Sequence, residues 1–180
     1  MKRCHWVDEK SDIYIRYHDC EWGVPVYDDR ELFEMLVLES FQAGLSWLCV
    51  LKKRQAFRGV LDNFDPDKIS KYDEEKISIL LQNKEIIRSR RKIEAMILNA
   101  KIFLDIQKEW ETFSNYIWHF TDNKVIKNMD DNLKTTSDLS DEVSFDLKRR
   151  GMKYVGSVII YSYLQAIGVI DDHEIECFKY

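Results

Sequence analysis

The sequence predicts an all-α fold, and two features of the chain support this expectation. Apolar residues recur with a period near 3.6 along most of the chain, which is typical of helices that bury one face. Chain breakers are scarce, because the 180 residues include two prolines, Pro25 and Pro66, and six glycines. Helices joined by short turns are therefore expected after an irregular, aromatic-rich opening over residues 1–27.

The first helix is predicted to run from about residue 29 to residue 40. Asp28 can accept hydrogen bonds from the free amides of its first turn. Leu32, Phe33 and Leu36 then share one face, which we expect to be buried.

Further helices are expected as far as residue 120. Ser46 is a natural N-cap after the break at residues 42–44, and Pro66 suits the first turn of a short helix after Asp65. The predicted ranges are 46–57, a short helix from 66, 73–81, 88–107 and 113–120.

The last third begins with a polar segment, residues 121–138, that is predicted to be a loop. Ser140 is expected to open a helix that ends at the basic residues 148–150, with Gly151 following as a typical C-terminal glycine. The apolar stretch 155–170 predicts a buried helix, because it is too short and too polar to cross a bilayer.

Composition predicts one domain spanning residues 1–180. With 45% hydrophobic residues the chain can bury a sizeable core. The net charge of -5 argues by itself against a nucleic-acid partner. Basic residues do cluster in residues 52–54, 88–92 and 148–153, although such runs are usually solvated helix faces.

No apolar segment follows the first basic residues, so no secretion signal is expected and the protein is predicted to be cytoplasmic. No membrane partner is expected, and a monomer is the default. The four cysteines are then more readily thiols or metal ligands than disulfide halves.

Four residues near the two ends form a candidate zinc-ligand set, Cys4 and His18 with His173 and Cys177. The last two have i, i+4 spacing, which places both on one face if that segment is helical. Two thiolates and two imidazoles suffice for a closed, structural zinc site. By spacing alone, buried thiols and satisfied histidines are the more frequent alternative, and His5 is a rival ligand.

Aromatic residues make up 13% of the chain and are dense in its first 47 residues, where three of the five tryptophans lie. Such a cluster is usually part of a core, and an aromatic binding pocket is the less frequent interpretation. The sequence leaves both open.

Several long segments of the chain resemble the 3-methyladenine DNA glycosylase I family, in order and over essentially the whole length. The segments are RCHWV (3–7), YHDCEWGVP (17–25), LESFQAGLSW (38–47), VLKKR (50–54), IIR (86–88), KRRG (148–151), VG (155–156) and DH (172–173).

This resemblance implies a fold and a metal. The expected fold is a two-lobed helical member of the helix-hairpin-helix glycosylases, whose N- and C-terminal segments are joined by one structural zinc. Cys4, His18, His173 and Cys177 would be its ligands.

The resemblance also implies the base-recognition site. Glu39 and Tyr17 would hydrogen-bond an extruded base, Trp47 would stack on it, and Trp6 and Trp22 would complete an aromatic wall. Without the resemblance, Glu39 is more readily a solvated helix end, Trp47 a core residue and Tyr17 a buried hydroxyl.

DNA contacts are implied more loosely, at a hairpin over residues 83–87 and at the break in 42–45. The residues expected to touch DNA are Gln42, Gly44, Leu45, Arg88, Lys92 and Lys153.

The implied activity is monofunctional excision of 3-methyladenine from alkylated double-stranded DNA, with the free base as product. A flipped, cationic base would be attracted by indole faces and by the Glu39 carboxylate. A zinc-containing module that binds damaged DNA without cleavage is the alternative. A weaker one treats Cys49 as a reactive thiol, although a thiol on an apolar helix face is more often core.

Overall fold

The computed structural model describes residues 1–129 and 134–180 and is mostly helical, so the predicted fold class is confirmed. Residues 130–133, which belong to the loop expected over 121–138, lie outside the described residues. The elements are α1 (Asp12–Cys20), α2 (Asp29–Gln42), α3 (Trp47–Val60), the 3-10 helix η1 (Asp62–Phe64), α4 (Pro66–Ile69), α5 (Glu74–Gln82), α6 (Arg90–Trp110), α7 (Phe113–His119), β1 (Ile126–Lys127), α8 (Asp138–Arg149), α9 (Ser157–Ala166) and β2 (Ile170–Asp171).

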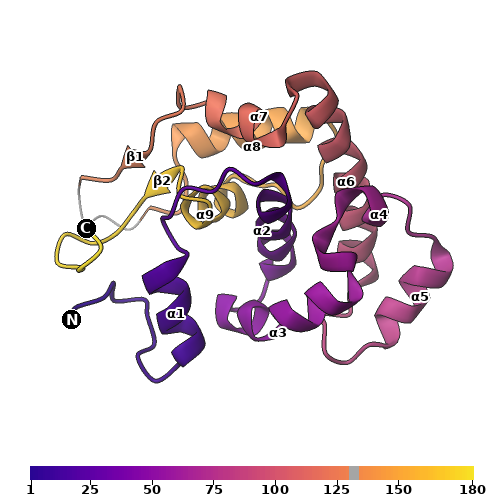
Figure 1. Cartoon of the computed structure of the whole chain (residues 1–180), viewed down its shortest axis with the longest axis horizontal. Helices are drawn as coiled ribbons and strands as arrows, with labels where there is room; N and C mark the ends of the chain where they lie inside the picture. The colour runs from indigo at the N-terminus through magenta and orange to yellow at the C-terminus, as the bar shows by residue number, and fades with distance from the viewer. Residues whose placement is uncertain (130–133) are drawn as a thin grey trace.

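Helix α2 is the centre of the fold (Figure 1). Its side chains from residue 32 to residue 41 are all buried, and it contacts α3, α6, α7 and α9. A helix that is covered on every side carries apolar residues on most of its faces, which explains why the sequence of α2 predicts a core element. At its start the Asp28 carboxylate accepts hydrogen bonds from the amides of Arg30 and Glu31, both at 3.0 Å.

The predicted helix starts between residues 28 and 90 are confirmed to within two residues. Ser46, Asp65 and Asp73 each accept a hydrogen bond from an amide two or three residues further on, and Pro66 occupies the first turn of α4. Local capping chemistry therefore defines these boundaries without help from tertiary contacts.

Two expectations for the less regular segments were wrong. Residues 12–20, expected to be irregular, form α1, whose N-cap Ser11 makes no side-chain cap hydrogen bond and so gives no capping signal. The expected loop 121–138 contains β1, which pairs in parallel with β2, Ile126 opposite Ile170. A two-residue pairing between distant segments carries no periodic pattern of its own.

The helix expected to open at Ser140 begins three residues earlier, because Ser137 is the N-cap of α8. Ser137 Oγ accepts from the Ser140 amide at 3.1 Å, and Ser140 Oγ accepts from the Ser137 amide at 2.7 Å. This is a capping box in which serine takes the place of the usual glutamate.

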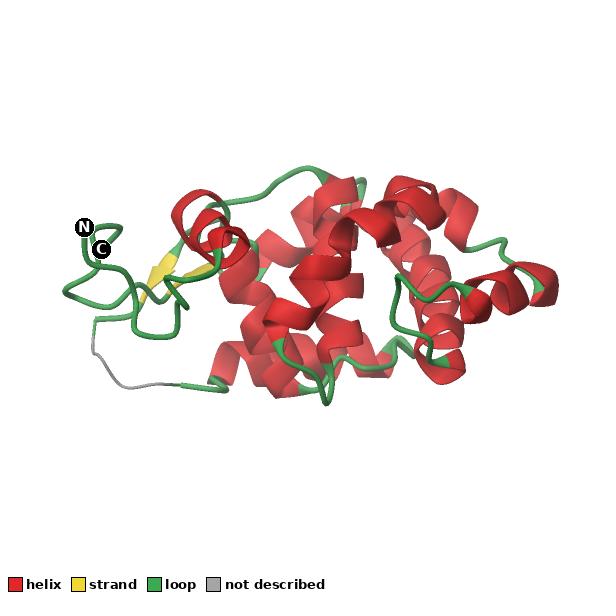
Figure 2. Ribbon diagram, turned by 90° about the horizontal axis from the view of Figure 1, so that it is seen from below, coloured by secondary structure: helices red, strands yellow, loops and turns green. Residues whose placement is uncertain are grey.

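The N- and C-terminal segments lie side by side in both views (Figures 1 and 2). The Phe178 amide donates to the Lys2 carbonyl at 2.9 Å. Nearby, Gly168 has a φ of +70°, and a Cβ there would lie 2.3 Å from the Val24 carbonyl carbon. Only glycine allows the end of α9 to approach residues 24–26 this closely.

Candidate active site and metal centre

Four of the predicted aromatic residues form one cluster. The Trp6 ring lies 5.0 Å from the ring of Trp22 and 6.4 Å from that of Tyr17, and Tyr17 lies 5.4 Å from Trp47. The edge-to-face and tilted arrangements are those that aromatic quadrupoles favour. Residues from the N-terminal segment, α1 and α3 are thereby brought together, and their role in binding a base stays a prediction.

Glu39 lies on α2, is 3% exposed, and has one carboxylate oxygen, Oε2, that is buried without a hydrogen-bond partner among the described residues. Burial alone raises the pKa of Glu39 to about 8. The free protein therefore holds a largely neutral carboxylic acid at this position near pH 7.

Tyr17 and Trp47 present polar groups in the same part of the molecule. Burial, followed by the nearby charge of Glu39, raises the pKa of Tyr17 well above its usual value, so its phenol keeps its proton. The indole N–H of Trp47 is buried and has no acceptor in the described part of the chain. Tyr17 also borders a hollow of about 420 Å³. The Glu39 and Trp47 side chains are both nearly covered by surrounding atoms. A cavity that the two side chains share therefore stays a prediction.

A buried ion-pair network that the sequence analysis missed fixes α1 against α2 and α3. Arg54 of α3 pairs with Glu21 at the end of α1 and with Glu34 of α2, and Glu34 also accepts from Arg58 at 3.0 Å. Glu34 is 5% exposed. The signal was present in the sequence, because Glu34 falls among apolar residues on the central helix and a buried carboxylate requires a cation.

Three of the four predicted metal ligands lie in one buried group. The ligand atoms of Cys4, His18 and Cys177 are within 4.8 Å of one another. Residues 172–180 contain turns and no helix, so Cys177 and His173 do not share a helix face. Instead, a turn lies between His173 and Cys177, in which the Cys177 amide donates to the Glu174 carbonyl at 2.8 Å.

His173 stands beside this group, with its ring centroid 5.3 Å from that of His18. Its Nε2 is buried and has no hydrogen-bond partner within residues 1–129 and 134–180, while its Nδ1 lies 2.7 Å from an Asp171 oxygen. His18 repeats the arrangement, with Nδ1 2.8 Å from Asp19 and Nε2 3.4 Å from Cys177 Sγ. An aspartate that accepts Nδ1–H leaves Nε2 free for a metal, which is the usual outer-sphere pattern of metal-bound histidine.

The four predicted ligand residues offer two sulfur and two nitrogen atoms, which suit a metal ion of intermediate softness. Burial raises the pKa of Cys4 and lowers the pKa of His173, so without a metal the two groups are neutral. Asp19 stays ionised, because a hydrogen bond from Arg3 lowers its pKa to about 2. Two sulfurs and two imidazole nitrogens behind a buried surface are ligands typical of zinc.

The metal-ligand group and the aromatic cluster touch each other. The Trp22 ring lies 4.7 Å from the His173 ring, and the Trp6 ring lies 5.4 Å from the His18 ring. Gly23 allows this contact, because it has a φ of +72° and an added Cβ would lie 2.7 Å from His173 Cε1. The position of the aromatic wall therefore depends on the histidines.

The turn predicted to face DNA, residues 42–45, joins α2 to α3. Gly44 has a φ of +80° and the Leu45 side chain is 41% exposed. Lys92, predicted to contact DNA, instead donates from Nζ to the carbonyls of Phe41 and Ala43, both at 2.7 Å. Lys92 thus holds the turn in place, and its contact with phosphate stays a prediction.

The hairpin expected over residues 83–87 connects α5 to α6, and Lys53 Nζ donates to the Glu85 carbonyl at 3.0 Å. Arg88 is exposed. A second helix pair, α8 and α9, is joined by residues 150–156, which include the two glycines Gly151 and Gly156 and also Lys153. Both connections are open to solvent on part of their surface.

The remaining thiols and histidines lie outside the metal-ligand group. His5 pairs with Glu174 at the surface, Cys20 is exposed, Cys49 is half-buried on α3, and His119 stacks on Trp110 at 4.3 Å. None of these contacts favours a reactive thiol. The described helices include none long and apolar enough to span a bilayer.

Known proteins match this chain over almost its whole length. Residues 6–180 match the methyladenine glycosylase family. DNA-3-methyladenine glycosylase 1 of Escherichia coli K12 is 43% identical over 183 residues, covering 100% of this chain and 97% of that protein.

Two solved structures extend the comparison to three dimensions. A crystal structure of 3-methyladenine DNA glycosylase I has 45% identity, a TM-score of 0.94 and 98% coverage of both chains. A tyrosine-to-phenylalanine variant of 3-methyladenine DNA glycosylase I in complex with 3-methyladenine has 34% identity and a TM-score of 0.92, with 99% of this chain and 97% of that chain covered.

Proposed function

The chain belongs to the methyladenine glycosylase family, with 3-methyladenine DNA glycosylase I activity in base-excision repair, and we propose how its residues perform that activity. The enzyme hydrolyses the N-glycosidic bond of 3-methyladenine in alkylated duplex DNA and leaves an abasic site. It acts as a cytoplasmic monomer and releases the free base. A base inside a duplex is inaccessible to a buried carboxylate, so the nucleotide is first flipped out, at a cost of a few kcal/mol.

The observation that carries this proposal is the pair of unpartnered buried polar groups, Glu39 Oε2 and Trp47 Nε1, beside an aromatic cluster. A buried polar atom without a partner costs about 1–3 kcal/mol. A purine edge offers a donor that would satisfy Glu39 Oε2, and the face of the Trp47 ring stacks on the same base. Entry of the base therefore recovers free energy that the free protein has lost.

The positive charge of 3-methyladenine in the nucleotide provides discrimination. Indole faces attract a desolvated cation by about 2 kcal/mol. An adjacent cation also lowers the pKa of a carboxyl group, so the charged base converts Glu39 from its neutral form to a carboxylate that attracts it. Neutral adenine supplies neither effect.

Bond cleavage needs little assistance from the protein, because the charged base is already a good leaving group. The sugar passes through an oxocarbenium-like state that water captures. Glu39 and Tyr17 hold the base by hydrogen bonds while Trp47, Trp6 and Trp22 stack around it. No lysine is assigned as a nucleophile, so strand cleavage is not expected.

A structural zinc held by Cys4, His18, His173 and Cys177 is the second part of the proposal. The contact of Cys4, His18 and Cys177, the free Nε2 of His173, and the aspartates behind both imidazoles support it. A closed four-ligand shell leaves no position for water, so the metal joins segments and supplies no chemistry to the reaction. It keeps Trp22 against the base site.

The turn at Gln42, Gly44 and Leu45 is proposed to fill the space that the flipped base leaves in the duplex. The exposed Leu45 side chain and the two hydrogen bonds from Lys92 support this role. An apolar side chain inserted between base steps is a common way to keep a duplex open. Arg88 and Lys153 are proposed to contact phosphates nearby.

The test is release of 3-methyladenine from methylated duplex DNA by the wild type, Glu39→Gln and Glu31→Gln. Glu39→Gln keeps the shape and removes the charge, and it should slow release on the order of 100-fold, since a charge-assisted hydrogen bond contributes about 2–3 kcal/mol. Glu31→Gln is the control, an exposed glutamate on the same helix. Equal rates for all three would refute the role of Glu39. Binding without release by the wild type would favour the non-cleaving module.

A further inference from the structure

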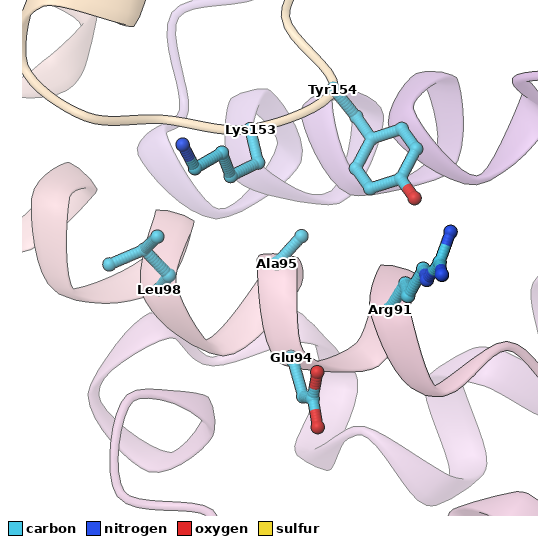
Figure 3. A pocket seen from close by; sticks show the side chains of 6 residues that line it. All are labelled: Arg91, Glu94, Ala95, Leu98, Lys153 and Tyr154. Atoms are coloured by element: carbon cyan, nitrogen blue, oxygen red, sulfur yellow. The ribbon is translucent and has the colours of Figure 1, made fainter.

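Two hollows of similar size differ in how their charged side chains are paired. The first, of about 480 Å³, lies between α6 and the connection from α8 to α9 (Figure 3). Its one acidic residue, Glu94, points away from Arg91 and Lys153 in Figure 3. Arg90 pairs with Glu74 and Glu94, whereas the neighbouring Arg91 has no ion-pair partner in the described part of the chain. The side chains of this hollow therefore do not join its two walls through an ion pair.

The second hollow, of about 420 Å³, lies between α1 and α3. Tyr17 and Glu21 line it from the side of α1, and Leu51 and Arg54 line it from α3. A space of this size holds several water molecules of about 30 Å³ each, so close packing does not fix the two helices along it. An ion pair bridges the hollow instead, because Arg54 Nη1 donates to Glu21 Oε2.

Arg54 connects the three helices that carry the proposed base-site residues. It lies on α3, pairs with the residue that follows α1, and donates from Nε to Glu34 of α2. Tyr17 lies on α1, Glu39 on α2 and Trp47 on α3. A single guanidinium therefore relates the positions of all three helices.

The ion pair acts on the turn of α1 that carries Tyr17. The Glu21 amide donates to the Tyr17 carbonyl at 2.9 Å, so a shift of Glu21 moves the backbone of Tyr17. On α3, Arg54 follows Trp47 by seven residues and lies two turns further along the same face. Burial raises the pKa of Tyr17 and the positive charge of Arg54 opposes this shift, as expected of side chains that lie near each other.

Helix α1 is attached to the rest of the protein at two places. His18 belongs to the metal-ligand group, which joins α1 to the terminal segments. On its other side α1 packs mainly on α3, where the Tyr17 ring lies 5.4 Å from the Trp47 ring and Glu21 pairs with Arg54. The second attachment connects α1 to the helices on which the base is proposed to rest.

We propose that Arg54 is a positioning residue for base recognition, which holds the last turn of α1 so that the Tyr17 hydroxyl reaches the base stacked on Trp47. The inference rests on the proposed function, because it takes Tyr17, Glu39 and Trp47 as the base site. It deepens that function by assigning a residue that itself touches no base. Without the ion pair to Glu21, α1 moves relative to α3 and the hydrogen bond from Tyr17 is lost, while the contacts of Trp47 and Glu39 remain.

The test is the affinity for free 3-methyladenine, measured by calorimetry on the wild type, Arg54→Gln and Glu21→Gln. Each variant should bind the base about fivefold more weakly, which is the effect of losing one hydrogen bond. The double variant should bind no more weakly than either single variant, because all three lack the same link. Glu21 has a side chain that is 36% exposed, so its variant folds even if Arg54→Gln does not.

Arg58→Gln is the matched control. Arg54 and Arg58 both donate to Glu34, so either single variant leaves that buried carboxylate with one cation. Arg58 makes no ion pair with α1 among the described residues. Both variants should therefore melt at a lower temperature than the wild type, but Arg58→Gln should bind 3-methyladenine as tightly as the wild type. Weaker binding by both would indicate a general loss of structure and overturn the positioning role.

A Tyr17→Phe background shows whether Arg54 acts through Tyr17. Tyr17→Phe alone should weaken binding of the free base about fivefold, because the hydroxyl is lost. In this background Arg54→Gln should have no further effect, since the contact that it positions is already absent. An equal loss of affinity in both backgrounds would mean that Arg54 acts on the site by another route, and the proposal would be wrong.

The results distinguish this inference from the proposed function. If Arg54→Gln and Glu21→Gln bind the free base as tightly as the wild type, the positioning role is refuted, whatever the wild type excises. If the variants behave as expected but the wild type releases no 3-methyladenine from methylated duplex DNA, Arg54 keeps its role and the proposed function fails. If the wild type does not bind the free base, both are refuted.

Discussion

Two regions of the molecule bury polar atoms that have no partner among the described residues: the aromatic cluster with Glu39, which we propose binds the base, and the metal-ligand group. The two regions are built differently. Glu39 Oε2 and Trp47 Nε1 are unpartnered in the first, and His173 Nε2 is unpartnered in the second. Behind the metal-ligand group, Asp19 and Asp171 bind the outer nitrogens of both histidines.

No such support stands behind Glu39, whose pKa is raised by burial alone. The difference matches the ligands that we propose. A metal that stays bound is held more tightly when oriented, charged groups hydrogen-bond to its ligands, because these groups raise the basicity of the ligands. A base that must leave after each turnover is better served by a carboxyl group that becomes charged only in its presence. Three changes test this comparison.

The largest effect is expected from Cys4→Ser combined with Cys177→Ser. The variant should lose about one zinc per chain, melt at a lower temperature and release 3-methyladenine poorly, because a structural zinc contributes on the order of 10 kcal/mol to folding. Metal analysis, thermal melting and base release measure the three effects. Cys20→Ser, at an exposed thiol, is the control.

Acid should also remove the metal from the wild type, because the ligands must be deprotonated to bind it and burial raises the pKa of Cys4. Zinc content that is independent of the cysteines would contradict the assignment. That result would also remove the difference that we draw between the metal-ligand group and the base site around Glu39.

An intermediate effect is expected from Glu39→Gln on the stability of the free protein. The folded-state pKa of Glu39 is about 8 and the unfolded value is near 4.5, so the folded state binds the proton more tightly. Stability from this group is therefore present below pH 4.5 and is lost as pH rises through 8. The variant should be more stable than the wild type by on the order of 4 kcal/mol at pH 8.

At pH 4.5 the two proteins should be nearly equal, and denaturant unfolding at both pH values measures the difference. Glu31→Gln should show no such trend. An equal difference at the two pH values would mean that Glu39 is ionised in the free protein.

The smallest effect is expected from Lys92→Met, which removes two hydrogen bonds to the α2 C-terminus. Stability should fall by about 1–2 kcal/mol. Release of 3-methyladenine from duplex DNA should slow while binding of the free base stays unchanged, because the turn at 42–45 is loosened and the base site is not. Lys101→Met, an exposed lysine on the same helix, is the control. Weaker binding of free base would place Lys92 in the base site itself.

Much of the helical framework could be predicted from sequence because its starts are local. Asp28, Ser46, Asp65 and Asp73 each bind amides within three residues, so each signal lies within a few positions. Helix α1 lacked such a signal, and the β1–β2 pairing joins residues more than 40 positions apart, which no local pattern encodes.

The candidate site divides in the same way. Cys4 and Cys177 are brought together by the whole fold, so spacing alone could not distinguish ligands from buried thiols, and the family resemblance supplied that step. Arg54 was interpreted as part of a basic run, although it is partly buried and paired with two glutamates, Glu21 and Glu34. Whether a charge is solvated or paired depends on neighbours distant in sequence, as Arg90 and Arg91 also demonstrate.

Because the Trp22 ring packs edge-on against the His173 ring, Trp22 fluorescence should report whether a metal is bound. Zinc itself has no absorption band in the visible range, but the Trp22 indole lies 4.7 Å from the ring of the proposed ligand His173, and we expect its emission to change when that ring gains or loses a bound cation. Tryptophan fluorescence in a stopped-flow instrument would then follow metal uptake in real time without any label. The molecule carries its own optical reporter at the junction of its two buried sites.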